Sequence, residues 1–272
     1  MNIWGLLLLA VIVVIAIWLA FVIIKWLFII AVVLFAPPSR ALAYRPFVST
    51  DAAVARPGEV EIEFGYAGFR RNDEHTTIVA PTVIANLGLG HDLELVGEFK
   101  LVNDLSRGAA RDRTRFEDSA VSVKWIAREG ALQEHGSQPS LGVELSALLP
   151  TIRGEDRPGG EVIGIMSGTA FGWTYHLNGG GLVEPGGDEP GLIWGAIVEH
   201  AIVGRLRGVA ELNGESVRQE EADNSALVGA IWEIEAPPPL HGLSLDVGVR
   251  HAISRAADEW GGTAGFTVAF PW

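Results

Sequence analysis

Residues 58–66 have the sequence Gly-Glu-Val-Glu-Ile-Glu-Phe-Gly-Tyr, and this stretch decides the fold class. Val60, Ile62, Phe64 and Tyr66 occupy one parity, whereas glutamates occupy most of the other. Successive side chains of a β-strand point to opposite faces, so the stretch predicts a strand with one apolar face and one acidic face.

The same alternation recurs as far as the C-terminus. Most of these segments are longer than the five or six residues usual in soluble strands, and they match the roughly nine to eleven needed to cross a bilayer at a tilt. We therefore predict an all-β fold, a transmembrane antiparallel up-and-down β-barrel of about twelve strands. The predicted strands span residues 58–71, 75–88, 91–102, 116–128, 139–150, 160–170, 172–184, 190–200, 203–216, 224–235, 240–253 and 259–272.

Connection lengths and aromatic residues support a bacterial outer-membrane location. Several of the longest polar connections follow odd-numbered strands, as extracellular loops do, and short turns follow most of the others. Trp125, Trp173, Trp232 and Trp260 fall toward predicted strand ends, where the aromatic girdles of such barrels lie.

The final strand carries a signal of its own. Phe266, Val268, Phe270 and Trp272 share one parity, and the chain ends on the aromatic residue. This pattern resembles the signal by which the outer-membrane assembly machinery recognises its clients, so we expect that machinery and outer-membrane lipid as partners. Pro271 departs from the pattern because it removes a hydrogen-bond donor from the strand.

Residues 1–43 form a separate apolar segment before the barrel domain, residues 44–272. Between Ile3 and Ala36 the only charged residue is Lys25, and Ala41-Leu42-Ala43 precedes Tyr44. A charged residue, an apolar run and a small-x-small site predict a cleaved export signal, with a retained inner-membrane helix as the alternative. Both interpretations place the remaining chain outside the cytoplasm.

Composition excludes several classes of function. The 272-residue chain has 20 Lys and Arg against 33 Asp and Glu, for a net charge of −13, which argues against nucleic-acid binding. It contains no cysteine, so disulfides and thiolate catalysis are excluded. We expect no cofactor and no metal site.

The charged parity of the strands supplies the residues that we predict to line the lumen. An acidic excess there favours cations, whereas ion pairs across the barrel would instead form a salt-bridged plug. His176 and Asn178 could contact a solute, although wall residues of this kind are more often only hydrogen-bonded. The predicted pore-lining residues are Glu59, Glu61, Glu63, Glu94, Glu98, Lys100, Lys124, Arg128, Glu144, His176, Asn178, Glu199, Arg205, Arg207, Glu211, Asp246 and Arg250.

No enzyme signature is present in the sequence. Ser119 and Ser146 are candidate nucleophiles, but no spacing pairs either with a base. The glycine-rich stretches 159–168 and 179–181 do not connect a strand to a helix, so neither predicts a phosphate loop.

Short motifs in the barrel domain resemble a known family. Residues 45–52 (Arg-Pro-Phe-Val-Ser-Thr-Asp-Ala), 88–90 (Gly-Leu-Gly) and 176–179 (His-Leu-Asn-Gly) are similar to outer-membrane barrels of the "MetA-pathway of phenol degradation" type. The resemblance extends over nearly all of residues 45–272. It implies a transporter of aromatic or other small organic compounds, and it implies no catalytic residues.

These observations predict a passive outer-membrane channel for small solutes, with an acidic lumen and a preference extending to hydrophobic or aromatic compounds. A closed barrel with a structural or adhesive role is the first alternative. An outer-membrane lipid hydrolase with a serine–histidine pair on the outer face is the second.

Overall fold

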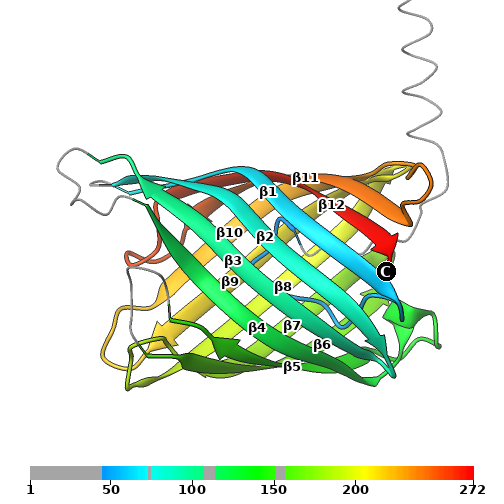
Figure 1. Cartoon of the computed structure of the whole chain (residues 1–272), viewed down its shortest axis with the longest axis horizontal. Helices are drawn as coiled ribbons and strands as arrows, with labels where there is room; N and C mark the ends of the chain where they lie inside the picture. The colour runs from blue at the N-terminus through cyan, green and yellow to red at the C-terminus, as the bar shows by residue number, and fades with distance from the viewer. Residues whose placement is uncertain (1–44, 73–74, 107–113, 151–156) are drawn as a thin grey trace, which may run out of the picture.

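The barrel domain is a closed antiparallel β-barrel in a computed structural model that describes residues 45–72, 75–106, 114–150 and 157–272 (Figure 1). Twelve strands pair in chain order, and β1 pairs with β12 to close the barrel. The predicted fold class and strand number are confirmed. The predicted export segment, residues 1–43, lies outside the described residues.

The observed strands differ from the predicted ranges by a few residues at their ends. They are β1 (Glu59–Arg71), β2 (Thr76–Gly90), β3 (Leu93–Asp104), β4 (Thr114–Arg128), β5 (Ser140–Leu148), β6 (Gly159–Ala170), β7 (Trp173–Val183), β8 (Pro190–Val203), β9 (Leu206–Val217), β10 (Asp223–Glu233), β11 (Gly242–Ala252) and β12 (Trp260–Pro271). One short 3-10 helix, η1 (Ala131–Gln133), follows β4.

The two ends of the barrel differ in their connections. At one end, which we call the turn end, β6 joins β7 through Phe171 and Gly172, whose φ angles of 53° and 81° suit a tight hairpin turn. At the other end, the loop end, the connections after odd-numbered strands include residues 105–113 and 149–158. Outer-membrane barrels have long extracellular loops and short periplasmic turns, so the turn end corresponds to the periplasmic side.

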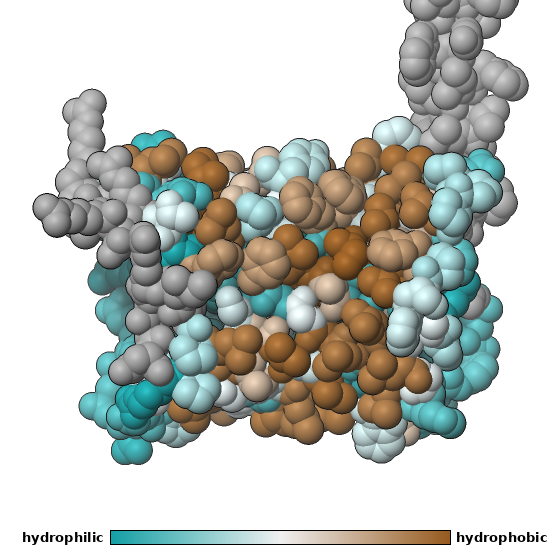
Figure 2. All heavy atoms as spheres, in the orientation of Figure 1, coloured by the Kyte–Doolittle hydropathy of each residue, from teal (hydrophilic) through white to brown (hydrophobic). Residues whose placement is uncertain are grey.

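The outer face of the barrel carries an apolar belt. Hydrophobic side chains cover the middle of the face seen in Figure 2, and hydrophilic residues gather toward the left and right ends. Large exposed residues such as Val123, Trp194, Leu212 and Val247 belong to this belt, which suits the hydrocarbon of a bilayer. Within the described ranges, no helix is long and apolar enough to cross a membrane.

Candidate functional site

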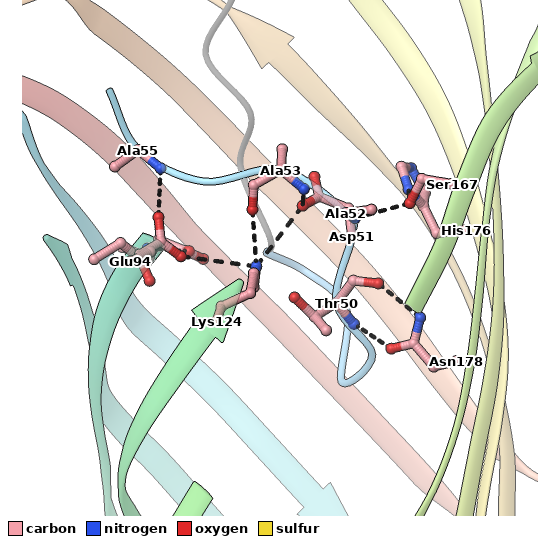
Figure 3. A network of polar contacts seen from close by, with 12 residues as sticks. Thr50, Asp51, Ala52, Ala53, Ala55, Glu94, Lys124, Ser167, His176 and Asn178 are labelled. Atoms are coloured by element: carbon pink, nitrogen blue, oxygen red, sulfur yellow. Dashed lines mark hydrogen bonds and ion pairs between the residues drawn. The ribbon is translucent and has the colours of Figure 1, made fainter. Parts of the chain in front are cut away.

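Residues 45–57 lie inside the barrel, and we call them the luminal segment. Their polar contacts come from β1, β3, β4, β6, β7, β9 and β11, strands spread over the whole circumference of the barrel. Only a segment within the lumen can contact all of these strands. In Figure 3 its residues Thr50–Ala55 cross the interior between Glu94 and Lys124 on one side and Ser167, His176 and Asn178 on the other.

Carboxylates of the wall hold the main chain of the luminal segment. The Arg45 N–H donates to Glu63 Oε2 at 3.0 Å, and the Ser49 N–H donates to Glu211 Oε1 at 2.8 Å. The Ala55 N–H donates to Glu94. Hydrogen bonds to charged groups are stronger than those between neutral groups, so each carboxylate is an effective anchor for an otherwise irregular stretch.

Neutral side chains complete the main-chain hydrogen bonding. Asn178 accepts from the Thr50 N–H and donates to the Thr50 carbonyl, both at 2.8 Å, as a neighbouring strand would. The Ala52 N–H donates to Ser167 Oγ at 2.8 Å, and Gln133 Nε2 of η1 donates to the Ala52 carbonyl at 2.6 Å. The segment therefore has defined partners on opposite walls.

Two small apolar clusters anchor the same segment. Ala52 is fully buried against Ile126 and Ile165, and Phe47 packs against a cluster that includes Leu227 and Ile231. Because these wall residues point into the lumen, they would contact water if the segment were absent. Their burial adds a hydrophobic contribution to the polar contacts.

Glycines of the inner wall leave space for the luminal segment. A Cβ at Gly195 would lie 1.9 Å from Ser49 Oγ, and one at Gly88 would lie 2.0 Å from the Arg56 carbonyl oxygen. A Cβ at Gly265 would meet Arg45 Nε at 2.4 Å. The wall is thus shaped to fit this segment, which indicates a built-in occupant of the lumen.

Lys124 of β4 is the central cation beneath the segment. Its Nζ donates to the Ala53 carbonyl at 3.2 Å and lies 3.7 Å from Glu94 and 3.8 Å from Asp51 (Figure 3). The Lys124 side chain is only 1% exposed. Asp51 of the segment and Glu94 of the wall therefore share one buried positive charge.

A second buried network joins β6, β7 and β8. Ser167 Oγ lies 2.8 Å from His176 Nδ1, and His176 Nε2 lies 3.1 Å from Glu199 Oε1. Arg207 of β9 forms an ion pair with Glu199. Residue types of this kind occur in hydrolases, but the Ser167 hydroxyl is buried and accepts the Ala52 N–H, so the luminal segment covers it.

The inner wall toward the loop end is more accessible than the wall beneath the segment. Glu98 and Lys100 form an ion pair at 3.3 Å with side chains about one quarter exposed (27% and 26%). Lys100 also reaches Asp118 at 2.8 Å, and Arg70 pairs with Glu117. Water therefore reaches this part of the wall, in contrast to the buried contacts of the luminal segment.

Carboxyl groups gather on another part of the loop-side wall. Glu161 of β6 contacts only the Ser146 hydroxyl, at 3.4 Å, among the described residues. Glu215 of β9 interacts with Glu184 from the β7–β8 connection and is close enough to Asp223 and Glu161 for charge repulsion. Outside the strands, the guanidinium of Arg157 in the β5–β6 connection bonds to Asp188 in the β7–β8 connection and lowers the pKa of that carboxyl.

The structure separates the predicted pore-lining residues into three groups. Glu59, Glu61, Glu63, Glu94, Lys124, His176, Glu199, Arg205, Glu211 and Asp246 are buried. Glu98, Lys100, Glu144, Asn178, Arg207 and Arg250 are partly accessible, and Arg128 is exposed near the turn end, where it donates to the Pro139 carbonyl. Whether these residues line a conducting pore stays a prediction.

Sequence reasoning missed the luminal segment and the partners Ser167 and Gln133. The sequence analysis considered a plug made of ion pairs between opposite walls of the barrel. The structure instead contains ion pairs within one strand, such as Lys100–Glu98, and between adjacent strands, such as Arg207–Glu233. One available signal was the length of chain, residues 44–57, between the export segment and the first strand. A simple connection between the export segment and the first strand could be shorter than these fourteen residues.

No family model matches the chain, and no curated protein matches it. The barrel is similar to the crystal structure of the COG4313 outer membrane channel from Pseudomonas putida F1, with a TM-score of 0.56 and 11% identity over 83% of this chain and 100% of that one. At this identity the likeness shows the fold alone. A NanC porin structure also aligns, with a TM-score of 0.47 and 7% identity over 78% of this chain and 99% of that one.

The closed twelve-stranded fold and the apolar belt are those of an outer-membrane barrel, in agreement with the predicted location. The resemblance to the phenol-degradation type is not confirmed, because no family model matches.

Proposed function

We propose that the protein is an outer-membrane channel for small solutes in which the luminal segment narrows the passage. The observation that carries this proposal is the ring of contacts that residues 45–55 make with strands around the inner wall. Closure of the barrel does not depend on the segment, because the strand pairing of β1 with β12 completes it. The segment is therefore a separable element that reduces the open cross-section.

The charge on the accessible wall supports a preference for cations. Glu161 and Glu215 form no ion pair within the described part of the chain, whereas Lys100 and Arg70 are both paired with carboxylates. Unpaired acidic groups lining a passage attract cations and repel anions. The charged wall also supports the passage of polar or charged solutes. A preference for hydrophobic or aromatic solutes is supported by the family resemblance alone.

Single-channel conductance in a planar bilayer tests the proposal. Full-length protein purified from outer membranes is compared with a variant that lacks residues 45–57 and retains the export segment. We expect small steps from the first protein and steps several-fold larger from the second, with cation preference under a salt gradient. A synthetic peptide of residues 45–57, added to the deletion variant, should reduce the large steps, whereas a scrambled peptide should not.

Equal conductance from both folded proteins would refute the role of the segment. The burial of the segment also favours the closed structural or adhesive barrel, and this alternative predicts that neither protein conducts. The experiment therefore separates a narrowed channel, an unobstructed channel and a closed barrel.

A further inference from the structure

Glu61 of β1 is a buried carboxylate with no partner among the described residues. The side chain belongs to the inner face of β1, and the residue is 6% exposed. Glu59 and Glu63, two positions before and after it, each have partners: His241 lies 2.8 Å from Glu59, and Asn86 donates to Glu63 at 3.0 Å. In the described ranges no hydrogen bond or ion pair involves Glu61. Its oxygens are not among the fully buried polar atoms that lack a partner, so they keep some contact with solvent, from which a cation can reach them.

Four further carboxyl groups surround Glu61. Glu63, Glu94, Asp51 and Glu59 all lie close enough to repel a negative charge on it. They form a cluster between the wall of β1–β3 and the luminal segment, because Glu94 accepts the Ala55 N–H and Asp51 itself belongs to the segment.

The basic groups of this region are too few to balance the cluster. Lys124 contacts both Asp51 and Glu94, and the guanidinium of Arg45 contacts Asp246, a sixth carboxylate. His241 contacts only Glu59, at the edge of the cluster. Burying a charge without a compensating partner is strongly unfavourable, so the carboxylates of this cluster must either take up protons or be balanced by a bound cation.

The geometry points to a binding site for a small monovalent cation of the alkali type at Glu61. Asn86 is directly opposite Glu61 in the β1–β2 ladder, and directly opposite side chains lie about 5 Å apart. The Asn86 amide nitrogen donates to Glu63, which leaves its oxygen as a second ligand for a cation. Carboxylate and amide oxygens are suitable ligands for such hard ions.

The same geometry disfavours a multivalent metal. Calcium takes about six to eight oxygen ligands, commonly from several carboxylates. Within the described part of the chain, no three acidic or histidine side chains converge at distances that would hold a metal ion. One carboxylate, one amide oxygen and retained water are sufficient for a monovalent ion.

The site also has a consequence for the luminal segment. A cation at Glu61 reduces the repulsion between the wall carboxylates and Asp51, which lies in the segment. Occupancy of the site therefore stabilises the segment in the lumen. The inference does not depend on conduction, because binding can be measured in a barrel that transports nothing.

The test measures the thermal unfolding midpoint of the full-length protein in detergent at constant ionic strength and pH. Sodium or potassium chloride replaces choline chloride in steps, since the methyl groups of choline prevent close coordination of its charge by oxygen ligands. We expect the midpoint to rise with alkali cation and to saturate. In Glu61→Gln the midpoint should no longer respond and should exceed that of the wild type in choline chloride, because one buried charge is gone.

Glu98→Gln is the matched control, because Glu98 is a glutamate of the same inner face but already pairs with Lys100. Its response to alkali cation should equal that of the wild type. Crystals soaked in rubidium chloride should show an anomalous peak beside Glu61 in the wild type and none in Glu61→Gln.

Three results would overturn the inference. A wild-type midpoint that depends on pH but not on the identity of the cation would show that the balancing charge is a proton or a group of the protein itself. An unchanged alkali response in Glu61→Gln would place the binding elsewhere. Crystals of the wild-type protein that show no rubidium peak beside Glu61 would also exclude a cation site at this residue.

Discussion

Replacement of Lys124 by methionine should release the luminal segment without unfolding the barrel. Methionine keeps most of the volume of the lysine stem but removes the charge shared by Asp51 and Glu94 and the donor to the Ala53 carbonyl. Removing one member of a buried ion pair costs about 3–5 kcal/mol, because the partner charge is left buried and unpaired. When the segment leaves the wall, the carboxylates of Asp51 and Glu94 are hydrated again. The loss of the Lys124 charge therefore destabilises the docked state and not the released state.

The size of the effect follows from this cost. Each 1.4 kcal/mol corresponds to about a tenfold change in an equilibrium constant, so the docked state should be disfavoured by roughly 100-fold or more. The chain has no cysteine, so a single introduced thiol can report on release of the segment without background. Ala53→Cys is suitable, because Ala53 is only 4% exposed in the docked segment.

The assay measures the rate at which a maleimide modifies this thiol in the folded barrel. When docking and release are fast relative to modification, the rate follows the population of the released state. We expect Lys124→Met to raise the rate about 100-fold over Ala53→Cys alone. Lys100→Met is the matched control, because Lys100 lies on the same inner face but pairs with Glu98 and Asp118 away from the segment.

A modification rate in Lys124→Met that stays within about threefold of the parent, in a barrel that remains folded on unheated gels, would refute the proposed role of Lys124. Such a result would mean that Lys124 contributes little to docking. A rise of equal size in Lys100→Met would instead indicate a general loosening of the wall.

Three further predictions concern the wall, the loop-side charge and the C-terminus. Gly88→Val should raise the same modification rate, because its Cβ would lie 2.0 Å from a main-chain oxygen of the segment, and Gly97→Val, with no atom within 4 Å, should not. Exchanging Glu161 and Glu215 for lysine should shift the reversal potential under a salt gradient toward anion preference, whereas an unchanged potential would exclude the loop-side wall from selectivity. Deleting Trp272 should lower the yield of heat-modifiable barrel in outer membranes several-fold, and full yield would remove the C-terminal residue from recognition by the assembly machinery.

The strands could be predicted from the sequence because each carries its information locally. In β1 and β11 the alternation of apolar and polar residues identifies the strand and its inward face without knowledge of the neighbours. The closed barrel then follows from the number and length of such strands.

The luminal segment could not be predicted in this way. Its residues have no periodicity, and its partners are distant in sequence: Val48 and Glu211 are separated by 163 positions. The contact between Ser167 and His176 is shorter in range but depends on the register of β6 and β7, in which these residues are directly opposite. A register shift of one residue would place them on opposite faces, and alternation alone does not fix the register of a hairpin.

The distribution of the segment's partners also has a consequence for biogenesis. Arg45 contacts Glu63 of β1 and Asp246 of β11, on the two sides of β12, so this site does not exist until the first and last strands have met. Other partners stand on opposite walls and come together only in the finished cylinder. Docking of the luminal segment is therefore completed only once the barrel has closed, which makes it one of the last steps in the folding of each new molecule.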